Sequence, residues 1–145
     1  MCGSPHHDFR LERTLHFPRL MAISPRDRPY EIRERLFLFA CDVVRIGQKL
    51  HAGGGVGSAL FPQLVNAAVS AASNAEEADD GSSRRDFLAK ERIVLRELKE
   101  TRLRLRVLRT TGLLSPMEDS LLAESTQLVK IVSTIIRNSD RGDER

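Results

Sequence analysis

The chain has 145 residues with 23 basic and 20 acidic side chains, which give a formal net charge of +3. This length is enough for one domain with a sizeable core and too short for two ordinary domains. No apolar run approaches the roughly 20 residues that span a bilayer, and residues 1–20 lack the apolar region of a signal peptide. We therefore expect a cytoplasmic protein that has no membrane partner.

Aromatic residues make up 5% of the chain, which contains no tryptophan and one tyrosine. Leucine, arginine, alanine and glutamate, all good helix formers, dominate its second half. This composition disfavours β-sandwiches and β-barrels. It also disfavours binding that depends on stacking single-stranded bases against exposed aromatic side chains.

Residues 1–30 contain four of the six prolines and show no sustained apolar period. They are predicted to form a disordered tail. A second interpretation is that translation begins at Met21, which would place the first twenty residues upstream of the true start.

Two amphipathic helices are predicted in the first half of the remaining chain. From Tyr30 to Leu50 apolar residues recur at the 3/4 spacing of one helical face, and the glycines of 53–57 then interrupt the pattern. Ser58 is a plausible N-cap for a second helix that runs to about Glu77. That helix carries a stripe of mostly small residues, which lets neighbouring helices approach closely: Leu64, Ala68, Ala71 or Ala72, and Ala75.

Two further helices are predicted in the second half. Ser83 and Asp86 have the spacing of a capping box, and Gly112 is well placed as the glycine that ends this third helix. Its inward face is assigned to five apolar residues: Phe87, Val94, Leu98, Leu105 and Leu108. Ser115 and Pro116 then signal the start of a fourth helix.

The fourth helix is predicted to fray near Asn138, which leaves residues 139–145 as a disordered C-terminal tail. Short links between four amphipathic helices favour antiparallel neighbours. The expected fold is therefore all-α, an antiparallel up-down four-helix bundle over residues 31–138.

The third predicted helix is strongly basic. Residues 84–109 contain ten basic and four acidic side chains, a local excess twice that of the whole chain. Seven of the basic residues fall on one broad stripe at 100° per residue: Arg85, Arg92, Arg96, Lys99, Arg102, Arg106 and Arg109. Such a stripe suits the phosphate backbone of RNA or DNA. The competing interpretation is a solvated face that nearby glutamates partly neutralise.

Two other groups of residues are candidates for contacts. If Phe87 and Leu98 point inward, the core does not cover three other leucines of this helix: Leu88, Leu95 and Leu103. We expect these leucines to form an oligomer interface. The alternative is that they are scattered exposed leucines, which are common on monomers. Polar side chains at spacings of four and three residues could anchor a ligand, and are more simply a buried polar network that ties helices together: Ser70, Asn74 and Glu77.

No arrangement of residues indicates catalysis, a metal site or a cofactor. The glycines of 53–57 lack the Gly-Lys-Ser/Thr ending of a phosphate-binding loop. Cys2 and Cys41 form neither a disulfide framework nor a zinc motif, and His16 and His51 are isolated. We expect no catalytic residues, no metal, no cofactor and no enzymatic activity.

Four short signals in this order resemble the small bacterial four-helix-bundle proteins encoded in ribosomal-RNA intervening sequences. The signals are Gln63-Leu64, Ser70-x-x-x-Asn74-x-x-Glu77, Asp86-Phe87-Leu88 and Leu95-x-x-Leu98-Lys99-Glu100. The chain departs from the family pattern at Ala78, where a glycine is usual, and at Val65-Asn66. The same superfamily includes the accessory variability determinant of diversity-generating retroelements. The resemblance implies a bundle that assembles as a ring of five protomers, a basic surface that contacts nucleic acid, and no catalysis.

Two functions follow as hypotheses. The first is a non-enzymatic, oligomeric protein that binds the backbone of RNA or DNA through the basic face of residues 84–109. The second is an oligomeric protein-interaction scaffold or accessory subunit, for example of a reverse transcriptase in a diversity-generating retroelement. The first predicts binding that weakens steeply with salt.

Overall fold

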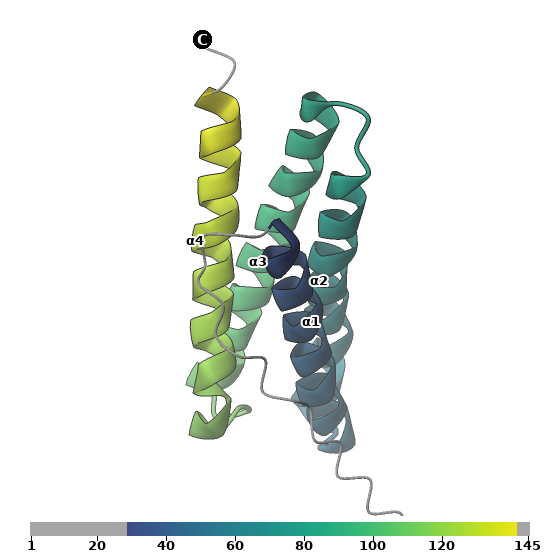
Figure 1. Ribbon diagram of the computed structural model, residues 1–145. Coiled ribbons are helices and arrows are strands. Elements are labelled where there is room, and N and C mark those ends of the chain that lie inside the picture. The colour runs from purple at the N-terminus through teal and green to yellow at the C-terminus, as the bar shows by residue number, and fades with distance from the viewer. Residues whose placement is uncertain (1–28, 142–145) are drawn as a thin grey trace, which may run out of the picture.

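A computed structural model describes residues 29–141, which form four α-helices and one short 3-10 turn (Figure 1). The elements in chain order are α1 (Pro29–Ala52), α2 (Gly55–Asp79), α3 (Arg84–Thr110), η1 (Pro116–Glu118) and α4 (Asp119–Arg141). The predicted N-terminal tail up to residue 28, the alternative start at Met21, and residues 142–145 lie outside the described part of the chain.

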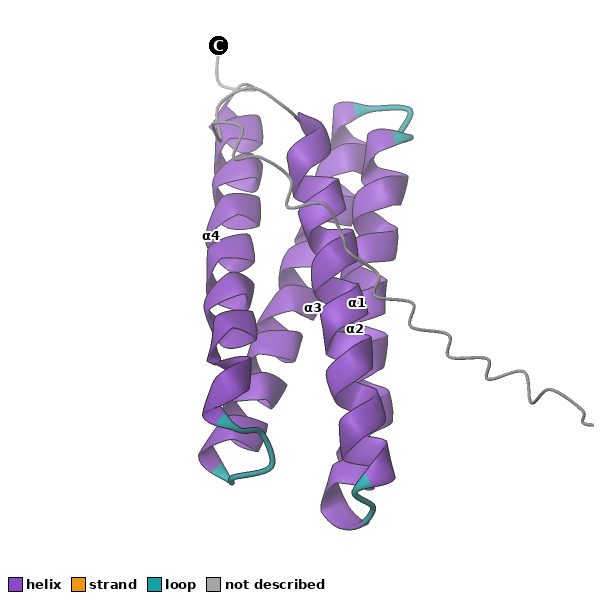
Figure 2. Ribbon diagram, turned by 60° about the horizontal axis from the view of Figure 1, so that its bottom comes forward, coloured by secondary structure: helices purple, strands orange, loops and turns teal. Residues whose placement is uncertain are grey.

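Consecutive helices pack against each other and run in opposite directions. The links α1–α2 and α3–α4 lie at one end of the molecule and the link α2–α3 at the other (Figure 2). Contacts of α1 with α4 are sparse beside those between consecutive helices. Two ion pairs from α1 reach its neighbours: Arg33 binds Asp79 of α2 at 2.7 Å, and Arg35 binds Glu124 of α4 at 2.9 Å. The predicted all-α, up-down four-helix bundle is confirmed.

The core lies along the axis of the bundle and draws on all four helices. Its fully buried members include Leu36 and Val43 of α1, Leu64 of α2, Leu98 of α3 and Leu128 of α4. The predicted apolar face of α1 is confirmed, but Phe37, which adjoins it, is 54% exposed, whereas Phe39 is buried. The buried face of α1 therefore includes Phe39 and not Phe37, so it is rotated slightly from the face that spacing alone suggests.

Small residues let α1 and α2 lie close together, as the stripe in α2 predicts. Ala68 and Ala71 are fully buried in the core. On the facing side of α1, a Cβ at Gly47 would come within 2.6 Å of the Phe61 ring and 2.7 Å of Val65. No real side chain tolerates such distances, so the packing of these two helices depends on glycine at position 47.

The signals at the ends of α3 are confirmed. The Ser83 side chain accepts a hydrogen bond of 3.1 Å from the Asp86 backbone N–H, as an N-cap does. Hydrogen bonds with the Ser82 and Ser83 side chains hold the pKa of Asp86 below its ordinary value. Gly112 has a φ of 76°, and the Leu113 N–H reaches the Leu108 carbonyl at 2.9 Å, which closes the helix in a Schellman motif.

Two predicted boundaries are wrong. Ser58 does not cap α2, which begins at Gly55; its hydroxyl instead lies 3.1 Å from the His51 ring nitrogen. Gly57 is buried, and a Cβ there would lie 3.2 Å from the Leu50 carbonyl, so glycine at position 57 permits the close approach of α2 to the end of α1. At the other end of the chain, α4 continues through residues 139–141 instead of fraying at Asn138.

Among residues 29–141, no helix combines the length and apolar character that a membrane span requires.

Candidate functional site

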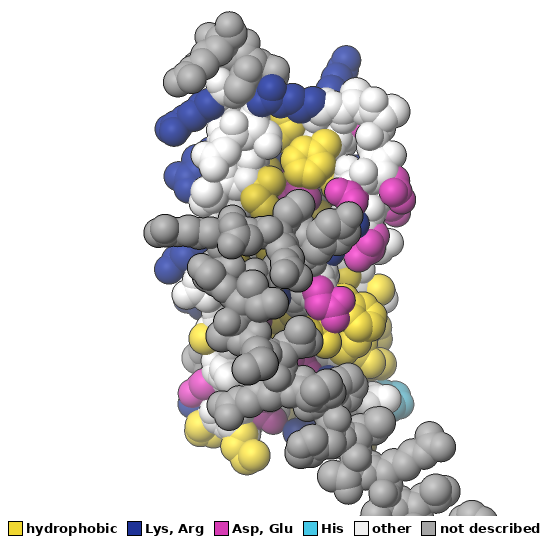
Figure 3. All heavy atoms as spheres, in the orientation of Figure 1, with side chains coloured by type: hydrophobic (Ala, Val, Ile, Leu, Met, Phe, Trp, Pro, Cys, Tyr) yellow, Lys and Arg dark blue, Asp and Glu magenta, His cyan; other side chains and the backbone are white. Residues whose placement is uncertain are grey.

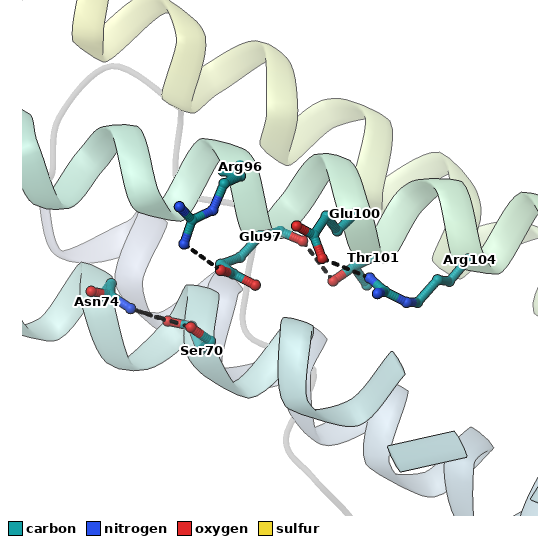
Figure 4. A network of polar contacts seen from close by, with 7 residues as sticks. All are labelled: Ser70, Asn74, Arg96, Glu97, Glu100, Thr101 and Arg104. Carbon is teal, nitrogen blue, oxygen red and sulfur yellow. Dashed lines mark hydrogen bonds and ion pairs between the residues drawn. The ribbon is translucent and has the colours of Figure 1, made fainter. Parts of the chain in front are cut away.

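One flank of α3 faces α2, and its charges are paired. Lys90 forms an ion pair with Glu77 of α2, which identifies the flank. Seven residues further along α3, Glu97 pairs with Arg96 at 3.0 Å, and Arg104 pairs with Glu100 at 2.9 Å. Figure 4 shows Glu97 pointing toward Ser70 and Asn74 on the facing side of α2. The acidic side chains in the middle of α3 thus form ion pairs with neighbouring arginines of the same helix.

The opposite flank of α3 faces α4 and is fastened to it at both ends. Arg92 binds Asp140 at 2.9 Å near the end of α4, and Arg109 binds Asp119 at 2.6 Å at its start. The hydrogen bond to Asp119 raises the pKa of Arg109 above its ordinary value. These two pairs fix the register of two antiparallel helices. Arg92 and Arg109, which the sequence analysis assigned to nucleic-acid binding, thus form ion pairs within the protein.

Between these two ion pairs lie three cations of α3 that we call the α3 row: Lys99, Arg102 and Arg106. Lys99 and Arg106 follow Arg92 at intervals of seven residues, and Arg102 precedes Arg109 by seven, so all three share the flank toward α4. Lys99 and Arg106 are exposed and Arg102 is half-buried. Within the described part of the chain, no carboxylate forms an ion pair with any of them.

The structure therefore divides the seven predicted basic residues into two groups. Arg92, Arg96 and Arg109 form ion pairs. Arg85 joins the α3 row in having no ion pair with residues 29–141, and it is exposed near the start of the helix. The sequence showed the stripe but not this division, because the partners of Arg92 and Arg109, Asp140 and Asp119, lie on another helix.

The expectation that the core leaves Leu88 uncovered is wrong. Leu88 is 5% exposed and belongs to the core, and Leu95 is half-buried and packs against it. The two leucines lie about one turn before and after Arg92, whose guanidinium binds Asp140, so they occupy the flank that α4 covers. Of the three leucines predicted to form an oligomer interface, Leu103 alone is exposed, at 58%.

The predicted polar network of Ser70, Asn74 and Glu77 does not form as one unit. The Asn74 amide donates to the Ser70 carbonyl at 2.9 Å and to the Ser70 hydroxyl at 3.3 Å, so this pair lies within α2. Glu77 is mostly exposed and pairs with Lys90 of α3 instead. Glu77 therefore links α2 to α3, but through an exposed ion pair with a lysine and not through a buried network.

Glu91 is a buried carboxyl that sequence reasoning missed. It is 6% exposed, on the α3 flank between Leu88 and Leu95, and no hydrogen bond or ion pair within residues 29–141 involves it. Burial raises its pKa from 4.5 to about 7. The sequence signal for its burial is its spacing of three residues from Leu88 and four from Leu95. This spacing indicates a buried Glu91 only when both leucines are known to be buried.

The outward face of α4 carries two cations that the sequence reasoning also missed, which we call the α4 row: Lys130 and Arg137. Both are exposed and lie seven residues apart, so they share a face. Lys130 lies eleven residues, or about three helical turns, after Asp119, so the two residues share a side of α4. Asp119 binds Arg109 of α3, which shows that this side lies toward α3. Figure 3 shows Lys and Arg side chains projecting along the edge of the molecule where α4 runs.

A pocket of about 370 Å³ lies between α1 and the start of α4, away from both rows. Asp42, Glu118 and Glu124 line it together with Arg45 and the apolar Ile46 and Leu121. The Ser115 hydroxyl holds the pKa of Glu118 below its ordinary value, so this carboxylate stays charged. An excess of carboxylates makes this pocket unsuitable for a phosphate.

Comparison with solved structures finds a protein of similar fold. A solved structure from Bacteroides thetaiotaomicron, a protein of unknown function from the S23 ribosomal protein family, has the same fold with a TM-score of 0.68. The two chains are 26% identical, and the match covers 74% of this chain and 96% of the other. No protein-family model matches the chain, and no curated protein matches it either.

Proposed function

We propose that the protein is a non-enzymatic nucleic-acid-binding protein whose α3 row contacts the phosphate backbone of RNA or DNA. The observation that carries the proposal is the separation of charges on α3. The acids Glu97 and Glu100 pair with Arg96 and Arg104, whereas Lys99, Arg102 and Arg106 have no carboxylate partner among residues 29–141. Cations that no acid neutralises are available for an external anion.

The chemistry of the α3 row suits a polyanion. Each arginine can bind a phosphate through two parallel N–H···O bonds, and lysine adds a compact point charge. The row runs from residue 99 to residue 106, about 10 Å at 1.5 Å per residue, which spans about three phosphates of one strand at an axial rise of roughly 3.4 Å per phosphate. Binding of this kind is driven by the release of counterions and recognises backbone and shape more than base edges.

The resemblance to the intervening-sequence proteins supports the proposal and extends it. The similar solved structure is a protein of unknown function that is assigned to the S23 ribosomal protein family, and this family name is consistent with an RNA ligand for this chain. By the same resemblance we propose a cytoplasmic homo-oligomer, a pentamer in the family pattern, and membership of the superfamily that contains the retroelement accessory protein.

A second candidate function, a protein-interaction scaffold or a reverse-transcriptase accessory subunit, has one observation in its favour. Leu103 is 58% exposed and Val107, one turn further along α3, is 46% exposed. Two neighbouring apolar side chains on an outer helical face suit contact with another protein. Their position beside the α3 row means that such a contact would compete with nucleic acid for part of α3.

Equilibrium binding of the purified protein to a labelled RNA hairpin and a labelled DNA duplex tests the proposal. We expect binding in 50 mM salt that weakens steeply by 200 mM, with a slope of about −0.9 in log K against log[salt] for each phosphate contacted. The mass in solution, measured by light scattering, is recorded alongside. An intact oligomer that binds neither nucleic acid at low salt would refute the proposal and favour the scaffold.

A further inference from the structure

The α4 row lies beside the α3 row. The two ion pairs at the ends of α3 and α4 show which residues of the two helices lie opposite each other. Arg92 stands opposite Asp140 and Arg109 opposite Asp119. Interpolating between these pairs places Lys130 about opposite Lys99, and Arg137 about two turns toward the Arg92 end, near Arg96. The two rows are therefore staggered and meet at the two lysines.

Within residues 29–141, the acids near this combined surface are buried or paired: Glu91 is 6% exposed, and Asp119 and Asp140 bind Arg109 and Arg92. Between Asp119 and Asp140 the acidic residue of α4 is Glu124, and it binds Arg35 of α1 on the other side of the helix. Outward positions of α4 carry small or neutral polar side chains instead, such as Thr126, Ser133 and Thr134. The Arg137 guanidinium donates to the Thr134 hydroxyl at 3.1 Å, which leaves its charge uncompensated.

The two rows lie on neighbouring helices, whose axes are roughly 8–10 Å apart, so together they form a cationic surface wider than one row. A duplex presents two phosphate backbones to such a surface, whereas a single strand presents one.

The aromatic content of α3 and α4 also favours a duplex. α4 contains no aromatic residue, and the one in α3, Phe87, is partly buried and packs against the core. Proteins that prefer single strands use exposed aromatic side chains on which bases stack. This surface has none within the described residues of the two helices.

We infer that Lys130 and Arg137 form the second half of the nucleic-acid site, and that the ligand is a double-stranded helix whose two backbones lie along the α3 and α4 rows. This inference rests on the proposed function of the α3 row. With five cations engaged, the slope of log K against log[salt] for a B-form duplex is expected to be about −4.5.

The double variant Lys130→Gln, Arg137→Gln tests the inference. Both side chains are exposed and neither forms an ion pair with residues 29–141, so the fold is expected to stay intact. Loss of two contacts should reduce the salt slope by about 1.8 and weaken duplex binding about 60-fold in 0.1 M salt. The matched control, Arg45→Gln with Lys49→Gln, removes the same charge from α1, where both side chains form ion pairs within the protein. It should leave the duplex affinity within about twofold, because it removes no contact with the duplex.

The outcomes separate this inference from the function on which it rests. Wild-type protein should bind a 20-base-pair duplex at least tenfold more tightly than either of its single strands. If the double variant binds the duplex as the wild type does while changes in the α3 row abolish binding, the inference is wrong and the proposed function stands. If the wild type binds neither form at low salt, the proposed function itself fails.

Discussion

Neutralising the α3 row by Lys99→Gln, Arg102→Gln and Arg106→Gln is expected to weaken binding to a nucleic-acid duplex about 500-fold in 0.1 M salt. Each phosphate contact contributes about 0.9 log units of affinity at that salt concentration through counterion release, and three contacts are lost. The salt slope should become shallower by about 2.7 for the same reason. Competition binding at three salt concentrations measures both quantities.

The triple variant should remain folded, because Lys99 and Arg106 are exposed, Arg102 is only half-buried, and none of the three pairs with a carboxylate among residues 29–141. Its far-ultraviolet circular dichroism should equal that of the wild type. Arg45→Glu with Lys49→Gln removes the same three units of charge from α1 and serves as the control. Equal weakening in the control would show that total charge, and not the α3 row, determines affinity.

The free energy of unfolding is expected to fall as pH rises from about 5 to 8, and Glu91 is the cause. Burial raises the pKa of this carboxyl from 4.5 to about 7. Between these two values the folded protein holds a proton that the unfolded chain has released, so a rise in pH favours unfolding. The full stability is present below pH 4.5, and about 2 kcal/mol is lost above pH 7 once screening by nearby water is allowed for.

Glu91→Gln should remove this part of the pH dependence. The amide has nearly the same shape as the protonated carboxyl and cannot ionise, so the variant should match the wild type at pH 5 and exceed its stability by about 2 kcal/mol at pH 8. Urea unfolding at four pH values gives the difference directly. Glu100→Gln, a change at a less buried acid of the same helix, is the control. A constant difference between wild type and Glu91→Gln across this range would contradict the assignment.

Local signals in the sequence predicted the fold well. Ser83, Gly112 and the apolar spacing of the helices act within a few residues of their own position, so the sequence is enough to identify them. Ser58 failed as a cap because the corner before α2 is set by the close approach of Gly57 to the Leu50 carbonyl, a contact between two helices. Such a contact has no signature in local spacing.

The burial of Leu88 shows the same limit for α3. A single apolar stripe describes a helix with one covered side, whereas α3 packs against α2 on one flank and α4 on the other. Leu88 and Leu95 fill the flank toward α4, and the sequence alone does not show that a second helix covers them.

Charge spacing predicted the position of the candidate site but not its composition. The stripe on residues 84–109 contained the α3 row, yet Arg92 and Arg109 turn out to fasten α4 through Asp140 and Asp119. These partners lie 48 and 10 residues away in the chain. Lys130 and Arg137 are two isolated cations in the sequence, and their significance depends on the register that the two ion pairs set.

Lysine footprinting is the most direct test of the claim that the α3 and α4 rows form one nucleic-acid-binding surface. The chain has four lysines, of which Lys99 and Lys130 belong to the rows, whereas Lys49 and Lys90 lie outside them in ion pairs with Glu118 and Glu77. Acetylation with and without a saturating duplex, read by mass spectrometry, should show protection of Lys99 and Lys130 and unchanged reactivity of Lys49 and Lys90. Protection of Lys49 or Lys90 with Lys99 and Lys130 unchanged would contradict the account.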